Sequence, residues 1–213
     1  MSSRHDRWNR AEETGIPSGN FSGADAASSE DAFEDARTRE EAGFAQAKAA
    51  ILAALQVEPE LRGLKDSLLI EDTPEGLRVQ ILDRDRLPMF PVGSDAMYPH
   101  TRRLLDLVVE AVAGTRNRIS LRGHTDSLPF AAGSGRDNWH LSADRANATR
   151  LAMIAAGLDP GRVAEVVGRA DAEPLVADHP TDPRNRRISV VLLRAPDRTA
   201  GGPARPSSEA GGG

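Results

Sequence analysis

Two stretches of the sequence decide the fold: Arg122-Gly-His-Thr-Asp126-Ser-Leu-Pro-Phe130 and Asn138-Trp-His-Leu141-Ser142-Ala-Asp-Arg145-Ala146-Asn147-Ala148. The first follows a short strand expected at residues 119–121, and the second opens a helix expected over residues 141–156. The carboxylate of Asp126 then lies at the end of a strand, and the guanidinium of Arg145 lies in the first turns of a helix. Two opposite charges held in this way can bind a small zwitterion. The pattern therefore indicates a binding site rather than a reaction centre.

The segments on either side of these stretches predict further strands and helices. Apolar runs at residues 68–70 and 77–81 flank a turn that contains Pro and Gly, which is typical of a β-hairpin. Apolar residues at helical spacing predict a helix over residues 97–113. Residues 163–167 are expected to form a third core strand, and the apolar run at residues 188–193 predicts a buried central strand. This order predicts an α+β fold (an α/β sandwich) in which helices pack on one mixed sheet.

The chain divides into four expected regions. Residues 1–30 lack apolar periodicity and are expected to be disordered. Residues 31–67 are expected to form a helical linker that supports dimerisation, because their apolar stripe is narrow and has no obvious place in the core. Residues 68–195 are expected to form the folded domain, and residues 196–213 a flexible tail.

Charge and composition exclude several classes of function. Residues 83–195 contain 16 Arg against 14 Asp and Glu, so the expected domain is nearly neutral. Nucleic acid is therefore an unfavourable partner, because phosphate binding requires a basic excess. The chain contains no cysteine, and no stretch approaches the roughly 20 apolar residues that span a bilayer. Residues 1–8 carry basic residues with no apolar run behind them, so no secretory signal is expected.

The motifs resemble the OmpA-like peptidoglycan-binding domain over residues 68–195. The resemblance depends on Gly-His-Thr-Asp126, on Leu141-Ser-x-x-Arg145-Ala, and on Asn185-Arg-Arg187. Within that superfamily the chain is most similar to the periplasmic domains of the MotB family of flagellar motor stator proteins. Four further motifs carry this similarity: Met89-Phe90 followed by Gly93-Ser94, Pro129-Phe130, Asn138-Trp139, and Asp182-Pro-Arg-Asn-Arg-Arg187.

The resemblance implies a βαβαββ domain that binds peptidoglycan non-covalently in the periplasm and anchors a flagellar stator to the cell wall. The implied ligand is the diaminopimelate end of a stem peptide, which offers an ammonium group and a carboxylate. The implied ligand-binding residues are Asp126, Arg145, Thr125, Asn138, Leu141 and Arg186. The implied partners are a second copy of the chain and a MotA-like channel subunit. That subunit is reached through a membrane helix that this sequence does not contain, so we expect either a fragment or an anchor elsewhere.

Several of these residues have structural alternatives. Asp126 and Arg145 could form an ordinary ion pair. Asn138 could cap the helix, and Arg186 could pair with a nearby carboxylate. His124 and Asp126 alone are a weak metal signal, and Ser142 is better explained as a helix-start residue than as a nucleophile. We therefore expect no cofactor, no metal and no enzyme. An envelope anchor unrelated to the motor and, less favourably, a wall-modifying enzyme are the alternative functions.

Overall fold

The structure is a computed structural model that describes residues 23–59, 61–131 and 133–196. The disorder expected before residue 23 and the tail expected after residue 196 lie outside the described residues. In chain order the elements are α1 (Gly23–Val57), η1 (Arg62–Ser67), β1 (Leu68–Thr73), β2 (Gly76–Leu82), α2 (Pro99–Val112), β3 (Ile119–His124), α3 (Asn138–Ala155), η2 (Pro160–Arg162), β4 (Val163–Gly168), η3 (Pro183–Asn185) and β5 (Arg187–Leu193).

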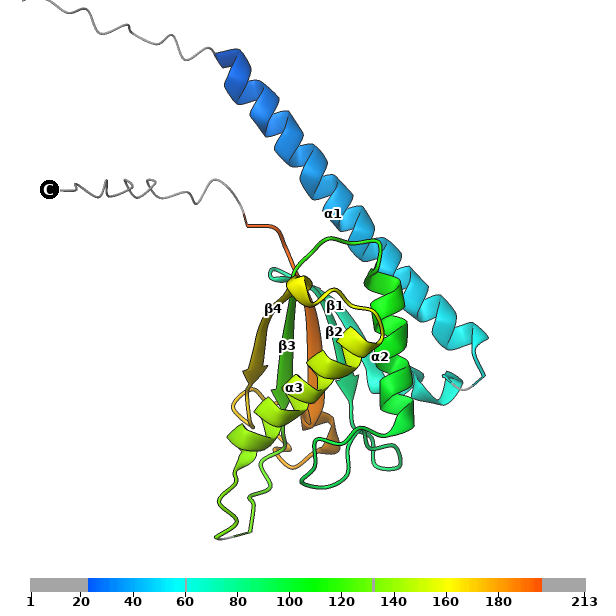
Figure 1. Ribbon diagram of the computed structural model, residues 1–213, viewed down its shortest axis with the longest axis vertical. Helices are drawn as coiled ribbons and strands as arrows, with labels where there is room; N and C mark the ends of the chain where they lie inside the picture. Colours follow the sequence, from blue (N-terminus) through cyan, green and yellow to red (C-terminus); the bar gives the residue numbers. More distant parts are fainter. Residues whose placement is uncertain (1–22, 60, 132, 197–213) are drawn as a thin grey trace, which may run out of the picture. The chain divides into compact units, whose positions relative to one another are not determined.

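The five strands form one mixed sheet in the order β1-β2-β5-β3-β4 (Figure 1). β1 and β2 make the predicted hairpin, and β5 runs antiparallel to both β2 and β3. The buried run at residues 188–193 is thus the central strand, as predicted. The predicted α+β class is confirmed, and β1 adds one strand to the implied βαβαββ order.

The position of β4 differs from the one expected for residues 163–167. It pairs with β3 alone, in parallel, so it forms an edge of the sheet rather than a third core strand. Its middle residues Glu165 and Val166 are exposed. The apolar run at residues 163–167 is short, and such a run does not by itself distinguish a core strand from an edge strand.

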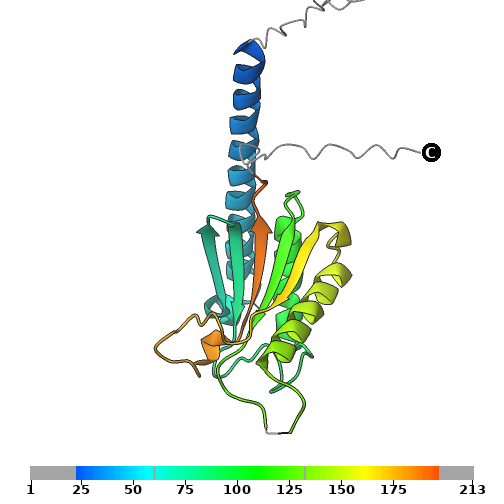
Figure 2. The same cartoon turned by 90° about the vertical axis from the view of Figure 1, so that its left-hand side faces the viewer.

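The core lies between the helices and one face of the sheet (Figure 2). Leu77, Val79 and Ile81 alternate along β2 with residues of the opposite face, which is the period-two pattern of a strand. The matching core residues of β5 are Ile188, Val190 and Leu192, and α2 contributes an apolar stripe that includes Leu104 and Val108. Within the described residues no helix is both long enough and apolar enough to cross a membrane.

α1 departs from the linker predicted for residues 31–67. It begins at Gly23, before the expected start, and runs through two compact units that divide between Thr38 and Arg39. Past that division, Phe44, Ile51 and Leu55 are buried in the core. The part of α1 from Phe44 to Leu55 thus shares the hydrophobic core of the domain that was expected to begin at residue 68. A narrow apolar stripe is sufficient here because it packs on the domain's own sheet.

Candidate ligand-binding site

A pocket of about 370 Å³ opens where β3 and β5 meet the start of α3. All six residues predicted from the sequence line it: Asp126, Arg145, Thr125, Asn138, Leu141 and Arg186. The other lining residues are Asp83, Pro88, Phe90, Val92, Gly93, Leu128, Pro129, Phe130 and Ala131. The pocket thus combines a charged part with an apolar rim, and Val92 and Leu128 expose their side chains there.

The register of the sheet brings the strand ends of the site together. β3 ends at His124, which pairs with Arg187 at the start of β5. Asp126 follows β3 and Arg186 precedes β5, so these residues extend from neighbouring strands at the same edge. On the other side of β5, Leu82 pairs with Arg187, which places Asp83 at that edge as well.

Two glycines allow α3 to lie against the strands. A Cβ atom at Gly123 would lie 2.1 Å from the Ser142 carbonyl oxygen, and one at Gly168 would lie 2.7 Å from Ser142 Oγ. Ser142 Oγ accepts a hydrogen bond from the Ala170 N–H at 3.0 Å and donates one to the Trp139 carbonyl oxygen. The Ser142 hydroxyl therefore helps to hold α3 against the sheet. This close approach of α3 directs Leu141 and Arg145 to the pocket.

Arg186 links two buried carboxylates. Its Nε atom donates to Asp83 Oδ2 at 2.7 Å, and its Nη1 atom donates to Asp126 Oδ2 at 2.6 Å. Burial disfavours the charge of Arg186, but the bonds to Asp83 and Asp126 outweigh burial and raise the pKa of the guanidinium above its usual value. Of the two roles considered for Arg186, the pairing with carboxylates is present in the structure.

Arg145 is buried and is bound to a loop rather than to Asp126. Its Nε atom donates to the Ser94 carbonyl oxygen at 2.9 Å, and Nη2 donates to the Pro91 carbonyl oxygen at 3.3 Å. Its guanidinium lies 4.7 Å from the centre of the Phe90 ring. Burial lowers the pKa of Arg145 to about 10, and the negative charges of Asp83 and Asp126 limit the shift. Arg145 is therefore charged at neutral pH, yet it forms no ion pair with any carboxylate of the described residues. The ordinary ion pair between Asp126 and Arg145, considered as an alternative from the sequence, is therefore not formed in the structure.

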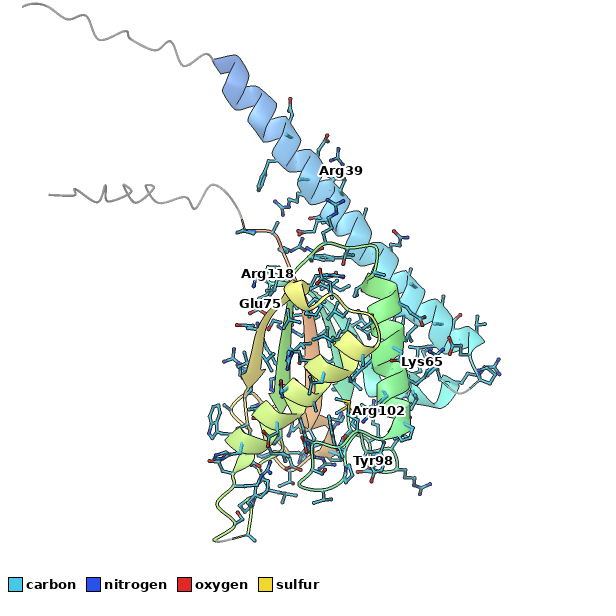
Figure 3. The ribbon with its side chains drawn as sticks, in the orientation of Figure 1. Arg39, Lys65, Glu75, Tyr98, Arg102 and Arg118 are labelled. Carbon is cyan, nitrogen blue, oxygen red and sulfur yellow. The ribbon has the colours of Figure 1, made fainter. Side chains whose placement is uncertain are left out.

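The loop that holds Arg145 is anchored at both ends. The N–H of Tyr98, which Figure 3 labels just before α2, donates to the Met89 carbonyl oxygen at 3.1 Å. The same carbonyl oxygen accepts from Thr101 Oγ1 at 2.9 Å, and the Met89 N–H donates to Asp83 Oδ1 at 2.6 Å.

Thr125 and Asn138 have different roles in the pocket. Thr125 Oγ1 is buried and has no hydrogen-bond partner in the described part of the chain. Asn138 Nδ2 donates to the backbone oxygens of Asp126 and Leu128, so Asn138 holds the loop that follows β3. The expected cap at Asn138 is corrected, because Asp137 accepts from the His140 N–H and caps α3.

Two guanidinium nitrogens of the pocket remain available for a ligand. Within the described residues Arg145 Nη1 and Arg186 Nη2 make no hydrogen bond. Asp126 accepts one hydrogen bond at each oxygen, from Arg186 and from the Leu128 N–H, which leaves acceptor capacity for a cation. The site can thus bind a group that carries an ammonium and a carboxylate side by side.

Asp83 is the residue of the site that the sequence analysis missed. Its signal was available, because it directly follows the strand predicted at residues 77–81 and precedes the Met89-Phe90 motif. Among the described residues no group of three or more His, Cys, Asp or Glu side chains is placed to hold a metal ion.

Comparison with known proteins identifies the class. Residues 89–188 match the model of the OmpA family, which is the resemblance that the motifs indicated. The sequence is also similar to Motility protein B of Escherichia coli K12, with 46% identity over 140 residues that cover 65% of this chain and 46% of that protein. The chain spans about half the length of this curated relative.

Solved structures show the same fold. A MotB-like protein from Desulfovibrio vulgaris superimposes with a TM-score of 0.60 at 23% identity, covering 75% of this chain and 99% of that one. A periplasmic domain of Helicobacter pylori MotB gives a TM-score of 0.53 at 18% identity, covering 62% and 85% of the two chains. The 46% identity to Motility protein B confirms the predicted resemblance to MotB, and the two solved structures confirm the α+β architecture.

Proposed function

We propose that this chain binds peptidoglycan non-covalently and anchors a flagellar motor stator to the cell wall. The observation that carries the proposal is the pocket that the Asp126 carboxylate lines together with Arg145 and Arg186, each of which has a nitrogen without a hydrogen-bond partner among the described residues. The similarity to Motility protein B supports the motor role, and the OmpA family match supports the choice of ligand.

The ligand that fits the pocket is the diaminopimelate end of a stem peptide. Its ammonium group binds Asp126, and its carboxylate accepts charge-assisted hydrogen bonds from Arg145 Nη1 and Arg186 Nη2. Leu141 and the apolar rim cover the carbon chain between these charges. Thr125 Oγ1, which has no partner among the described residues, contributes a further hydrogen bond.

In this role the domain works in the periplasm and resists force rather than catalysing a reaction. The stator can act on a rotor only when it is fixed to a rigid layer. The partners of such an anchor are peptidoglycan, a second copy of the chain, and a MotA-like channel subunit reached through a membrane helix.

Co-sedimentation with purified sacculi tests the wall-binding part of the proposal. The wild-type chain is expected to sediment with sacculi, and Asp126→Asn is expected to remain in the supernatant. Arg150→Ala is a matched control, because Arg150 also lies on α3 and its side chain bonds, among the described residues, to Asn147 Oδ1 alone. Equal sedimentation of Asp126→Asn and the control would reject the site. Release of soluble muropeptides during the incubation would instead indicate an enzyme.

A chimera tests the motor part. The 140-residue region of Escherichia coli Motility protein B that matches this chain is replaced by the corresponding region of this chain. Swimming that depends on Asp126 supports a stator anchor. Sacculus binding without any swimming favours a wall anchor unrelated to the motor.

A further inference from the structure

Asp83 is a buried carboxylate whose acceptor atoms are both occupied by the protein. Its side chain is 3% exposed. Oδ1 accepts the Met89 N–H at 2.6 Å, and Oδ2 accepts Arg186 Nε at 2.7 Å. The Asp83 N–H also donates to the Arg186 carbonyl oxygen at 3.0 Å. Asp83 is therefore bound to Arg186 through both backbone and side chain, which suits it to hold another residue in place.

The consequence for Arg186 is a fixed guanidinium with one free edge. Asp83 holds Nε and Asp126 holds Nη1, so the planar group is bound at two nitrogens. A long flexible side chain normally loses conformational entropy when it binds a ligand, and prior fixation removes that cost. The remaining nitrogen, Nη2, belongs to a side chain that is 27% exposed and lines the pocket.

Asp83 also affects the position of Arg145, through the loop that contains Met89 and Phe90. By binding the Met89 N–H, Asp83 fixes the residue next to Phe90, and the Arg145 guanidinium lies over the Phe90 ring. One carboxylate thus positions the two cations of the pocket along two separate routes. It does so without using an oxygen that the ligand needs.

We propose that Asp83 is a positioning residue that orients Arg186, and through Met89 and Phe90 also Arg145, toward a free carboxylate of the stem peptide. The proposal depends on the proposed function and makes it more specific. It implies that the site selects a diamino acid with an ionised carboxylate over one whose carboxylate is amidated. An amide group carries no charge and presents N–H donors to a pocket that already offers donors.

The test compares two synthetic tripeptides, L-Ala-γ-D-Glu-meso-diaminopimelate and the same peptide with an amidated diaminopimelate side chain. Titration calorimetry of the wild-type chain is expected to show a preference for the free acid of about tenfold or more, since hydrogen bonds between charged groups contribute more than neutral ones. In Asp83→Asn, which keeps the shape but loses the charge and one acceptor, the preference is expected to fall below about threefold. Asp85→Asn, an exposed acid two residues along the chain, is expected to keep it.

The ratio of the two affinities separates positioning from a general structural role. If Asp83 only stabilises the fold, Asp83→Asn weakens both peptides equally and the ratio stays near the wild-type value, which overturns the proposal. If the wild-type chain binds neither peptide, the proposed function fails together with this inference. If it binds both peptides equally, this inference fails together with the carboxylate contacts proposed for the two arginines, whereas wall binding through Asp126 stands.

A second variant keeps the test decisive if Asp83→Asn does not fold or binds too weakly to measure. Arg186→Lys retains the positive charge beside Asp126 but loses the planar guanidinium, and with it the Nη2 donor whose orientation Asp83 and Asp126 fix. The same loss of preference is expected. A preference that survives in Arg186→Lys contradicts the role of the fixed guanidinium.

Discussion

The guanidinium of Arg145 lies 4.7 Å from the centre of the Phe90 ring, and the same group donates to the carbonyl oxygens of Ser94 and Pro91. A residue predicted from the sequence as a ligand contact therefore also holds the loop that forms one wall of the site. Under the proposed function, ligand binding and stability depend on the same side chain.

Arg145→Ala is expected to lower the free energy of unfolding by about 2–4 kcal/mol, because it leaves two backbone acceptors unpaired and removes a cation–π contact. Urea denaturation measures this change. Arg150→Ala on the same helix is expected to stay within about 0.5 kcal/mol of wild type. Equal stability of the two variants would show that Arg145 does not stabilise the loop.

Gly123→Ala is expected to weaken both the fold and sacculus binding. The added Cβ would lie 2.1 Å from the Ser142 carbonyl oxygen, so α3 must move away from β3 and take Leu141 and Arg145 with it. A cost of about 1–3 kcal/mol is typical of such overpacking. Gly114→Ala is the control, since a Cβ at Gly114 meets no atom within 4 Å. Thermal unfolding and co-sedimentation are measured for both, and a silent Gly123→Ala would contradict the close approach.

Ile51→Ala is expected to destabilise the domain by about 2–5 kcal/mol, the usual cost of deleting a buried branched side chain. Ile51 is fully buried, whereas its neighbour Leu52 is 40% exposed. Leu52→Ala is thus a matched control with a small expected effect. If Ile51→Ala unfolds like the control in urea, α1 is a linker as its sequence suggested.

The lowered pKa of His124 predicts that the folded state loses stability in acid. Burial lowers the pKa of His124 from 6.5 to about 3, and the charges of Arg187, Arg169, Arg122 and Arg78 add to the shift. Because the pKa is lower in the folded state, the stabilising contribution is complete above about pH 6.5 and is lost as the pH falls toward about 3.

Unfolding in urea at pH 7 and pH 5 measures this contribution. Between these values the wild-type chain is expected to lose about 1–2 kcal/mol more than His124→Gln, which cannot titrate. The same pH dependence in both chains would mean that His124 binds a proton in the folded state.

The sequence predicted those features of the sheet and the site that depend on local patterns of residues. The hairpin, the central position of residues 188–193 and the six lining residues were all recoverable, because alternation, turn residues and the two motifs are local signals. The edge position of β4 was not recoverable, since it depends on which strands become neighbours.

Three contacts that the sequence analysis did not predict share one physical cause, which is pairing between distant parts of the chain. The burial of Phe44 and Ile51 depends on the sheet beneath them, and the partner of Arg145 is a loop about fifty residues earlier in the chain. Asp83 and Arg186 meet only because β2 and β5 are paired. Spacing along the chain carries no information about these contacts.

The central claim is that the pocket binds the diaminopimelate end of a stem peptide through Asp126. The most direct measurement is calorimetric titration of wild type and Asp126→Asn with a tripeptide that ends in meso-diaminopimelate, beside one that ends in lysine, which lacks the side-chain carboxylate. Wild type is expected to bind the first peptide more tightly than the second. Asp126→Asn is expected to lose about thirty-fold or more of that affinity, because removing one partner of a buried charge pair costs roughly 2–5 kcal/mol. Equal binding of the two peptides by the wild-type chain, or unchanged affinity in Asp126→Asn, would contradict the account.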